Sequence, residues 1–127
     1  MRIRPLIATP TLVLLAGCGG ASPEEEVRGV VTRFAAASAE KDYQVICDEL
    51  FASTLVDNAE QYGLPCEIAV KPGLDGVRAP ELTIKAVTVK GDRASARVAT
   101  DAANQTPSTV TLGLRRIADK WRITSQG

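Results

Sequence analysis

The feature that most constrains the fold of this chain is a change of residue pattern near position 81. Before it, apolar residues recur mostly at helical spacing; after it, β-branched residues are common and apolar and polar residues alternate. The second part divides into four runs, 82–89, 94–100, 108–117 and 121–124. The sequence predicts short turns at 90–93 and 118–120 and a polar loop at 101–107. Because these connections are short, the strands should pair as antiparallel hairpins.

Helices followed by strands in hairpin order are typical of the α+β class. We therefore predict a single α+β domain over residues 24–127, with N-terminal helices packed on an antiparallel sheet of about four strands. One face of such a sheet needs cover, and amphipathic helices supply it. The length suits one small domain.

Capping residues mark the start of the first helix. Ser22, Pro23 and Glu25 form a capping box with proline at the first helical position. Apolar residues then follow the helical period through residues 27–38. One side of this helix should therefore be buried.

Shorter helices are expected between the first helix and the sheet. Asp42 can cap a second helix over residues 43–50, and Ser53 or Thr54 can cap a third. Residues 66–70 fit one helical turn or a short strand, and we favour a short helix.

The N-terminal segment has the parts of an export signal. Arg2 and Arg4 supply a positive region, and residues 6–16 are mostly apolar. This run is too short for a membrane-spanning helix, which needs about 20 apolar residues. We expect residues 1–17 to be a signal peptide and residues 18–23 to be a short tether.

The four residues at the end of this segment, Leu15-Ala16-Gly17-Cys18, closely resemble the lipobox of bacterial lipoproteins. The resemblance implies cleavage before Cys18, attachment of diacylglycerol to its thiol, and acylation, such as palmitate, of the new amine. The protein would then be anchored by lipid to the cell membrane, on its extracytoplasmic (periplasmic or cell-surface) side. The alternative is an ordinary secretory signal in which Cys18 is incidental.

Two further cysteines, Cys47 and Cys66, should form a disulfide in an exported protein. Closing a loop of roughly 20 residues would contribute about 3 kcal/mol in the chain-entropy model. The alternatives are two free buried thiols or half of a metal site. The chain has no histidine and no other cysteine besides Cys18, so further metal ligands of these types are missing and we expect no metal.

Composition argues against several classes of partner. Without Arg2 and Arg4 the exported part has 13 basic and 15 acidic side chains, and Lys and Arg do not cluster along the sequence. We expect no nucleic-acid partner and no polybasic membrane-binding segment. The acyl chains would supply the membrane affinity, and we expect no cofactor.

The order of elements resembles the nuclear transport factor 2-like superfamily of cone-shaped domains. The features that carry the resemblance are the helix 27–38, the following Lys41-Asp42-Tyr43, the strand pair 87–99, Gly113-Leu114-Arg115-Arg116 and Lys120-Trp121-Arg122-Ile123. It implies a curved sheet around a long helix, with a pocket between them. Enzymatic members place Asp and His in that pocket. Because this chain lacks histidine, no catalytic residue carries over.

Three functions are compatible with these observations. The first is a non-catalytic domain that binds a small apolar molecule or an envelope protein. Candidate pocket walls are Phe34, Tyr43, Phe51, Tyr62 and Trp121, although each also suits the core of so small a domain.

The second is an enzyme, such as an isomerase, dehydratase or hydrolase, that uses a carboxylate base. Candidates are Asp48, Glu49 and Asp101, each of which is also expected as a solvated surface charge. The third is a homodimer formed through the free face of the sheet. Thr109, Thr111 and Arg115 make that face polar.

Overall fold

The protein is described from a computed structural model, whose described residues are 20–126, so the lipobox lies outside the described part. The helical part consists of α1 (Pro23–Glu40), α2 (Tyr43–Val45), the π-helical segment η1 (Ile46–Leu50), α3 (Ser53–Gln61) and α4 (Cys66–Leu74). The strands are β1 (Glu81–Lys90), β2 (Arg93–Ala102), β3 (Gln105–Ile117) and β4 (Lys120–Gln126). Helices on an antiparallel sheet confirm the predicted α+β class. Along residues 20–126, no helix combines the length and apolarity needed to cross a bilayer.

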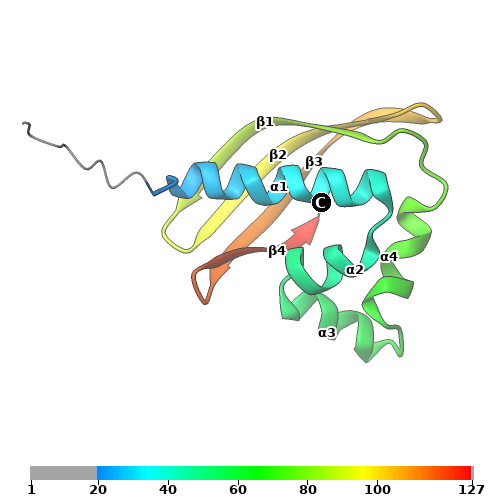
Figure 1. Ribbon diagram of the computed structural model, residues 1–127, viewed down its shortest axis with the longest axis horizontal. Coiled ribbons are helices and arrows are strands. Elements are labelled where there is room, and N and C mark those ends of the chain that lie inside the picture. The colour runs from blue at the N-terminus through cyan, green and yellow to red at the C-terminus, as the bar shows by residue number, and fades with distance from the viewer. Residues whose placement is uncertain (1–19, 127) are drawn as a thin grey trace, which may run out of the picture.

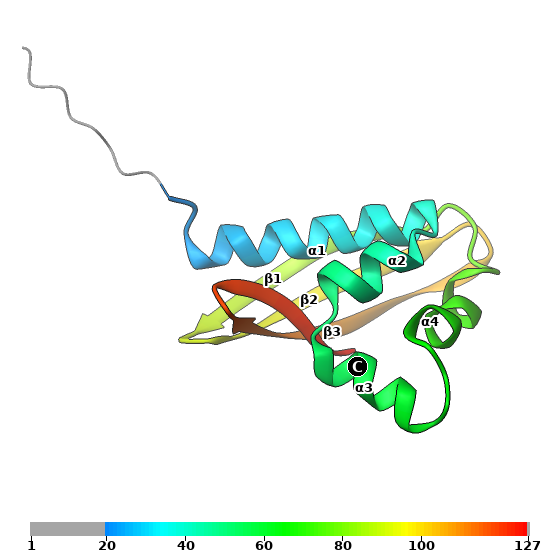
Figure 2. The same cartoon turned by 60° about the horizontal axis from the view of Figure 1, so that its bottom comes forward.

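The sheet has the order β1-β2-β3-β4, and every neighbouring pair is antiparallel. α1 runs along one face of it, while α2, α3 and α4 gather near one end (Figures 1 and 2). Each strand pair contains a register shift, and such irregularities bend a sheet. The bending lets the sheet curve around α1 and leaves room between the two layers.

α1 has the predicted start. Ser22 Oγ accepts a hydrogen bond from the Glu25 backbone N–H at 3.2 Å, and the Glu25 carboxylate accepts one from the Ser22 backbone. The helix buries Val27, Val31 and Phe34 against the sheet, and its C-cap is Lys41, which has a left-handed φ of 57°.

The core lies between α1, η1 and one face of the sheet. Its strand residues follow the predicted alternation, since inward and outward side chains take turns along a strand. The buried strand residues of the core cluster are Ala96, Val98, Leu112, Leu114, Trp121 and Ile123. On the opposite face Thr109, Thr111 and Arg115 are exposed.

Two predicted segments are wrong in extent. The polar loop 101–107 is instead a tight turn at Ala103 and Asn104, because β2 and β3 remain paired almost to their ends. Pro107 is tolerated in β3 because β4 pairs with that strand only from Leu112 onward.

The helical segment 66–70 extends further, to Leu74, and it contains Pro72. The third helix begins without the predicted Ser53 or Thr54 cap. Its N-cap is Ala52, which has no side chain able to cap the helix. The Ala52 backbone N–H donates to the Ile123 backbone oxygen in β4 at 2.8 Å.

Candidate ligand-binding cavity

Two adjoining hollows lie between the helices and the sheet, at the end away from the start of α1. The smaller, of about 220 Å³, lies between α1, the α4–β1 connection and the strands. The larger, of about 410 Å³, lies between α1, α3 and α4. Both are lined by Phe34, Gly73, Leu74 and Gln126, so we describe them together as the cavity.

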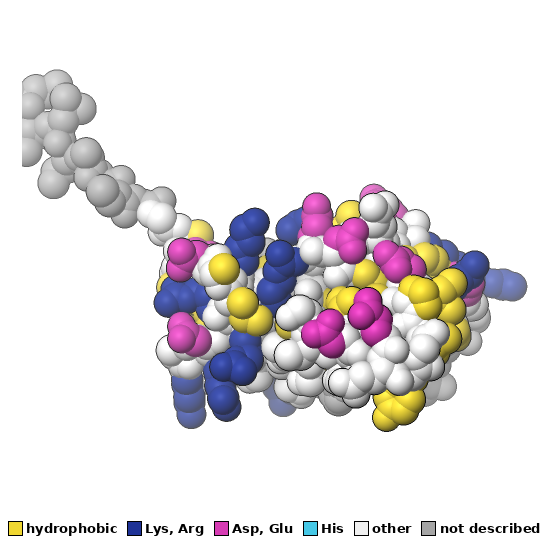
Figure 3. Space-filling view, turned by 90° about the horizontal axis from the view of Figure 1, so that it is seen from below, with side chains coloured by type: hydrophobic (Ala, Val, Ile, Leu, Met, Phe, Trp, Pro, Cys, Tyr) yellow, Lys and Arg dark blue, Asp and Glu magenta, His cyan; other side chains and the backbone are white. Residues whose placement is uncertain are grey.

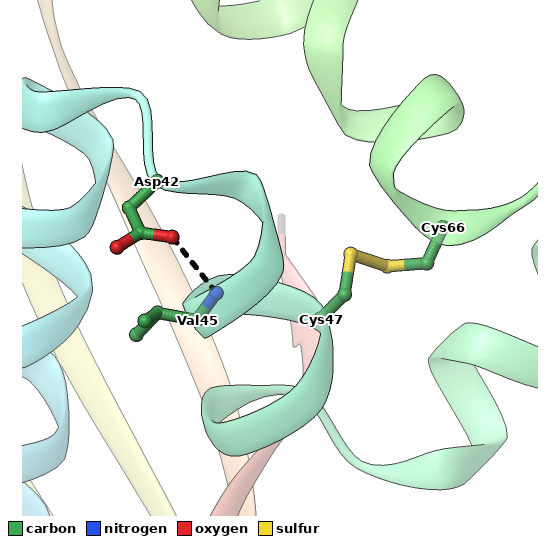
Figure 4. The surroundings of a disulfide bond; sticks show 4 residues. All are labelled: Asp42, Val45, Cys47 and Cys66. Carbon is green, nitrogen blue, oxygen red and sulfur yellow. Dashed lines mark hydrogen bonds between the residues drawn. A yellow bond between two sulfur atoms is a disulfide. The ribbon is translucent and has the colours of Figure 1, made fainter.

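The disulfide between Cys47 and Cys66 fixes one wall of this cavity, as predicted. It joins η1 to the first residue of α4, with the Cα atoms 5.9 Å apart (Figure 4). η1 is in turn positioned by Asp42, whose Oδ1 accepts from the Val45 backbone N–H at 3.1 Å. Phe51 follows η1 and forms a bridge with Ile123.

Hydrogen bonds from α1 and α2 hold the segment after α4. Lys41 Nζ donates to the Asp75 backbone oxygen at 2.6 Å, and the Tyr43 hydroxyl donates to the Asp75 carboxylate. Asp75 directly follows the last residue of α4. These contacts tie the C-terminal end of α4 to the end of α1.

Asn104, in the β2–β3 turn, holds the next part of the same connection. Its Nδ2 donates to the Gly76 backbone oxygen at 2.7 Å, and its Oδ1 accepts from the Arg78 backbone N–H at 2.9 Å. The α4–β1 connection is therefore held from both sides, with Val77 facing the smaller hollow.

Ser38 is the most deeply buried polar residue that lines the cavity. It is 2% exposed and is the one buried polar residue among residues 20–126, and it lines the smaller hollow. Its Oγ has no hydrogen-bond partner within the described chain. An unpaired buried hydroxyl costs free energy that a bound polar group would recover. The prediction missed Ser38, although a serine within an apolar helical stripe was a usable signal.

The structure brings together two of the five predicted wall residues. Phe34 and Phe51 line the larger hollow, with ring centroids 6.0 Å apart. Tyr62 is 85% exposed at the end of α3 and does not line the cavity. The Tyr43 hydroxyl donates a hydrogen bond to the Asp75 carboxylate and does not line the cavity. Trp121 is buried near the start of α1, where its Nε1 donates to Glu26 Oε2 at 3.1 Å. Those three predictions are therefore corrected.

The three candidate carboxylates are all exposed. Glu49 pairs with Arg33, and Asp48 lies on another part of the surface, beside Arg122. Asp101 is at the rim of the smaller hollow. Within residues 20–126 no carboxylate is buried in the cavity, and no group of His, Cys, Asp or Glu is placed to hold a metal ion.

The arrangement of a long helix across a curved four-stranded sheet defines the nuclear transport factor 2-like fold, and solved structures share it. An NTF2-like protein of unknown function from Shewanella baltica OS155 is 19% identical and aligns over 80% of this chain and 87% of its own, with a TM-score of 0.58. One from Silicibacter pomeroyi DSS-3 is also 19% identical and aligns over 80% and 89%, with a TM-score of 0.59.

A designed protein has the same architecture. The de novo designed NTF2 fold protein NT-9 is 15% identical and aligns over 84% of this chain and 87% of its own, with a TM-score of 0.56. No protein-family model and no curated protein matches the sequence. At these identities the likeness concerns the fold, so the function must be argued from the residues themselves.

Proposed function

We propose that this protein is a lipid-anchored, extracytoplasmic lipoprotein whose NTF2-like domain binds a small apolar molecule and carries out no catalysis. The observation that carries the proposal is the cavity, which has mainly apolar walls and one unpartnered hydroxyl, on Ser38. Sites for small molecules typically combine apolar walls with a few polar groups that fix orientation.

The chemistry of the walls suggests the class of ligand. Phe34, Leu74 and Val70 offer aliphatic and aromatic contacts, and the smaller hollow also has polar side chains such as Asp101 and Gln105 in its lining. The Ser38 hydroxyl, which is shielded in the ligand-free protein, could donate or accept one hydrogen bond once a ligand displaces its neighbours. A mostly hydrocarbon molecule with one carbonyl or hydroxyl group fits this set. A protein segment with an apolar side chain is the alternative occupant.

The anchor rests on the lipobox at Leu15-Ala16-Gly17-Cys18. Mass spectrometry of the protein purified from its membrane tests this part directly. We expect an N-terminus at Cys18 that carries fatty acid, and release of a Cys18→Ser variant from the membrane. An intact Met1 without fatty acid would contradict the anchor.

Binding in the cavity is tested with the neutral apolar dye Nile red and with native mass spectrometry. Leu74→Trp should weaken dye binding at least about tenfold, because Leu74 lines both hollows and a larger side chain fills them. Ile68→Trp is the matched control, since Ile68 lies on the same helix but is 53% exposed. Equal dye binding by both variants, with no retained ligand in the unmodified protein, would refute the proposal.

Ser38→Ala separates the role of the hydroxyl from a role in folding. A ligand that bonds to Ser38 should bind about fivefold more weakly, which corresponds to about 1 kcal/mol for one hydrogen bond. The thermal stability of the ligand-free variant should stay equal or rise, because an unpaired buried hydroxyl is removed.

A second candidate function is an enzyme that uses Asp101 as a base. It is favoured by the position of Asp101 at the rim of the smaller hollow. Under this hypothesis Asp101→Asn would abolish turnover of a bound substrate and leave its binding intact. Under the binding-domain proposal the retained ligand is recovered chemically unchanged from both proteins.

A further inference from the structure

Four basic residues form a row across the sheet, and three of them lie on the face opposite α1. Lys90 is paired with Arg93, Arg93 with Arg115, and Arg115 with Arg122, so one cation from each strand lies directly opposite the next. Their chain neighbours Val89, Ala94, Leu114, Trp121 and Ile123 point toward the core. Strand alternation therefore puts Lys90, Arg93 and Arg115 on the open face, whereas the Arg122 side chain reaches Asp48 in η1 at the edge of the sheet. We call these four residues the basic row.

The basic row is electrostatically unfavourable within the protein alone. Like charges directly opposite each other on neighbouring strands are destabilising. Among residues 20–126, no salt bridge involves Lys90, Arg93 or Arg115, and Arg122 donates to the Asp48 backbone oxygen rather than to a carboxylate. Arg97 adds a further cation on the same face. An external anion would relieve this repulsion.

Charge is separated along the molecule. Residues 82–126 carry eight Lys or Arg and three Asp, whereas residues 40–81 carry nine Asp or Glu and three Lys or Arg. Figure 3 shows Lys and Arg side chains gathered over the end where α1 begins, with most acidic side chains over the helices beyond. A large region of one sign attracts a partner of the opposite sign.

The N-terminal segment that carries Cys18 joins the domain at this basic end. The side chain of Trp121, next to Arg122, bonds to Glu26 in the first turn of α1. The start of α1 therefore lies beside the β3–β4 turn, as Figures 1 and 2 show. Cys18 precedes Pro23 by five residues, which span at most about 17 Å. An anchor at Cys18 would thus hold the basic end close to the bilayer surface.

Several acidic residues near the tether have contacts within the protein, although Asp119 of the β3–β4 turn, which lines a hollow with Glu26, forms no salt bridge within residues 20–126. Glu24 pairs with Arg28, Glu25 bonds to the Ser22 backbone, and Glu26 accepts from Trp121. Asp92, in the β1–β2 turn, pairs with Arg116. None of these carboxylates forms a salt bridge with Lys90, Arg93 or Arg115, which remain exposed.

We propose that the basic row binds the anionic headgroups of the membrane to which the protein is anchored. This inference rests on the lipid anchor of the proposed function. It gives the domain a defined orientation, with the basic end on the bilayer and the cavity at the opposite end, open to the aqueous side. The domain would then take its ligand from solution and not directly from the acyl region.

The test uses the mature chain with Cys18→Ser, so that no acyl chain contributes to binding. Flotation with vesicles rich in phosphatidylglycerol should capture this protein at low salt, and phosphatidylcholine vesicles should not. Capture should fall as salt is raised, because exposed charges are screened over about 10 Å at 0.1 M. Failure here leaves the anchor standing, since mass spectrometry of the N-terminus tests the anchor separately.

The double variant Arg93→Gln with Arg115→Gln should bind anionic vesicles about thirtyfold more weakly. Each basic residue near an anionic surface accounts for about a fivefold change, the equivalent of about 1 kcal/mol. Lys71→Gln with Arg78→Gln is the matched control, since it removes two cations from the acidic helical part and should change binding little.

Three results would overturn the inference. One is equal capture by neutral and anionic vesicles, and another is an equal loss in the control double variant. The third is equally tight binding of the soluble protein to polyphosphate or a short DNA duplex, which would point to a soluble polyanion.

Discussion

At the scale of single residues, the contact between Tyr43 and Asp75 has a measurable consequence. The hydrogen bond to the Asp75 carboxylate, with smaller contributions from desolvation and from that negative charge, raises the pKa of Tyr43 to about 12. Ionising the phenol would remove the donor and place two negative charges together. The contact therefore stabilises the end of α4 only while Tyr43 is protonated.

The upward shift of the Tyr43 pKa determines how this contact depends on pH. The folded pKa lies above the ordinary value of about 10, so the contact's stabilisation is complete below about pH 10 and is lost as pH rises through about 12. Spectrophotometric titration, compared with Tyr43→Phe, should find one tyrosine ionising near the higher value. Asp75→Asn should move that ionisation back toward 10. An unchanged titration in Asp75→Asn would contradict the contact.

At the scale of elements, α4 depends on tethering more than on burial. Cys66 is its one buried residue, and Pro72 removes a backbone hydrogen-bond donor from its second half. The disulfide holds its start, while Asp75 and Asn104 hold the chain that follows it. α4 is thus a cavity wall positioned by cross-links at both ends.

Removing the disulfide should destabilise the protein and open this wall. Cys47→Ser with Cys66→Ser should lower the free energy of unfolding by about 3 kcal/mol, because a closed loop of roughly 20 residues is released in the unfolded chain. Urea denaturation followed by Trp121 fluorescence measures the change, and Nile red affinity should fall with it. Reductant should lower the stability of the unmodified protein and leave the variant unaffected. Equal stability of the variant and the unmodified protein without reductant would contradict a stabilising disulfide.

At the scale of the whole molecule, the basic row bears on self-association. If two copies met through their open faces about a twofold axis that runs along the strands, their basic rows would approach each other. Such a dimer would bring cations together without the compensating carboxylates that it needs. The homodimer considered from sequence stays a prediction, and we expect this arrangement of it to be disfavoured.

Light scattering after size exclusion should find a monomer of the mature chain with Cys18→Ser at low salt. Replacing Arg93 and Arg115 with Gln removes the strongest repulsion, so any tendency to dimerise should increase in that variant. A stable dimer of the Cys18→Ser protein at low salt would contradict this expectation. So would a dimer that is no stronger after both arginines are replaced.

Local features were readable from the sequence because their physical causes are local. The capping box at Ser22, the cap at Asp42 and the alternation along residues 108–117 depend on neighbours within a few positions. The disulfide was predicted from two cysteines and the expectation that the protein is exported. These features were enough to predict the α+β class and the order of its elements.

Tertiary structure decided which residues meet. The cysteine pair and two phenylalanines reached their predicted places, but Tyr62 lies on the surface and Ser38 occupies the cavity. Sequence spacing could not show which helical faces turn toward a hollow. Nor could it show the basic row, because Lys90, Arg93, Arg115 and Arg122 are scattered along the chain and strand register alone aligns them.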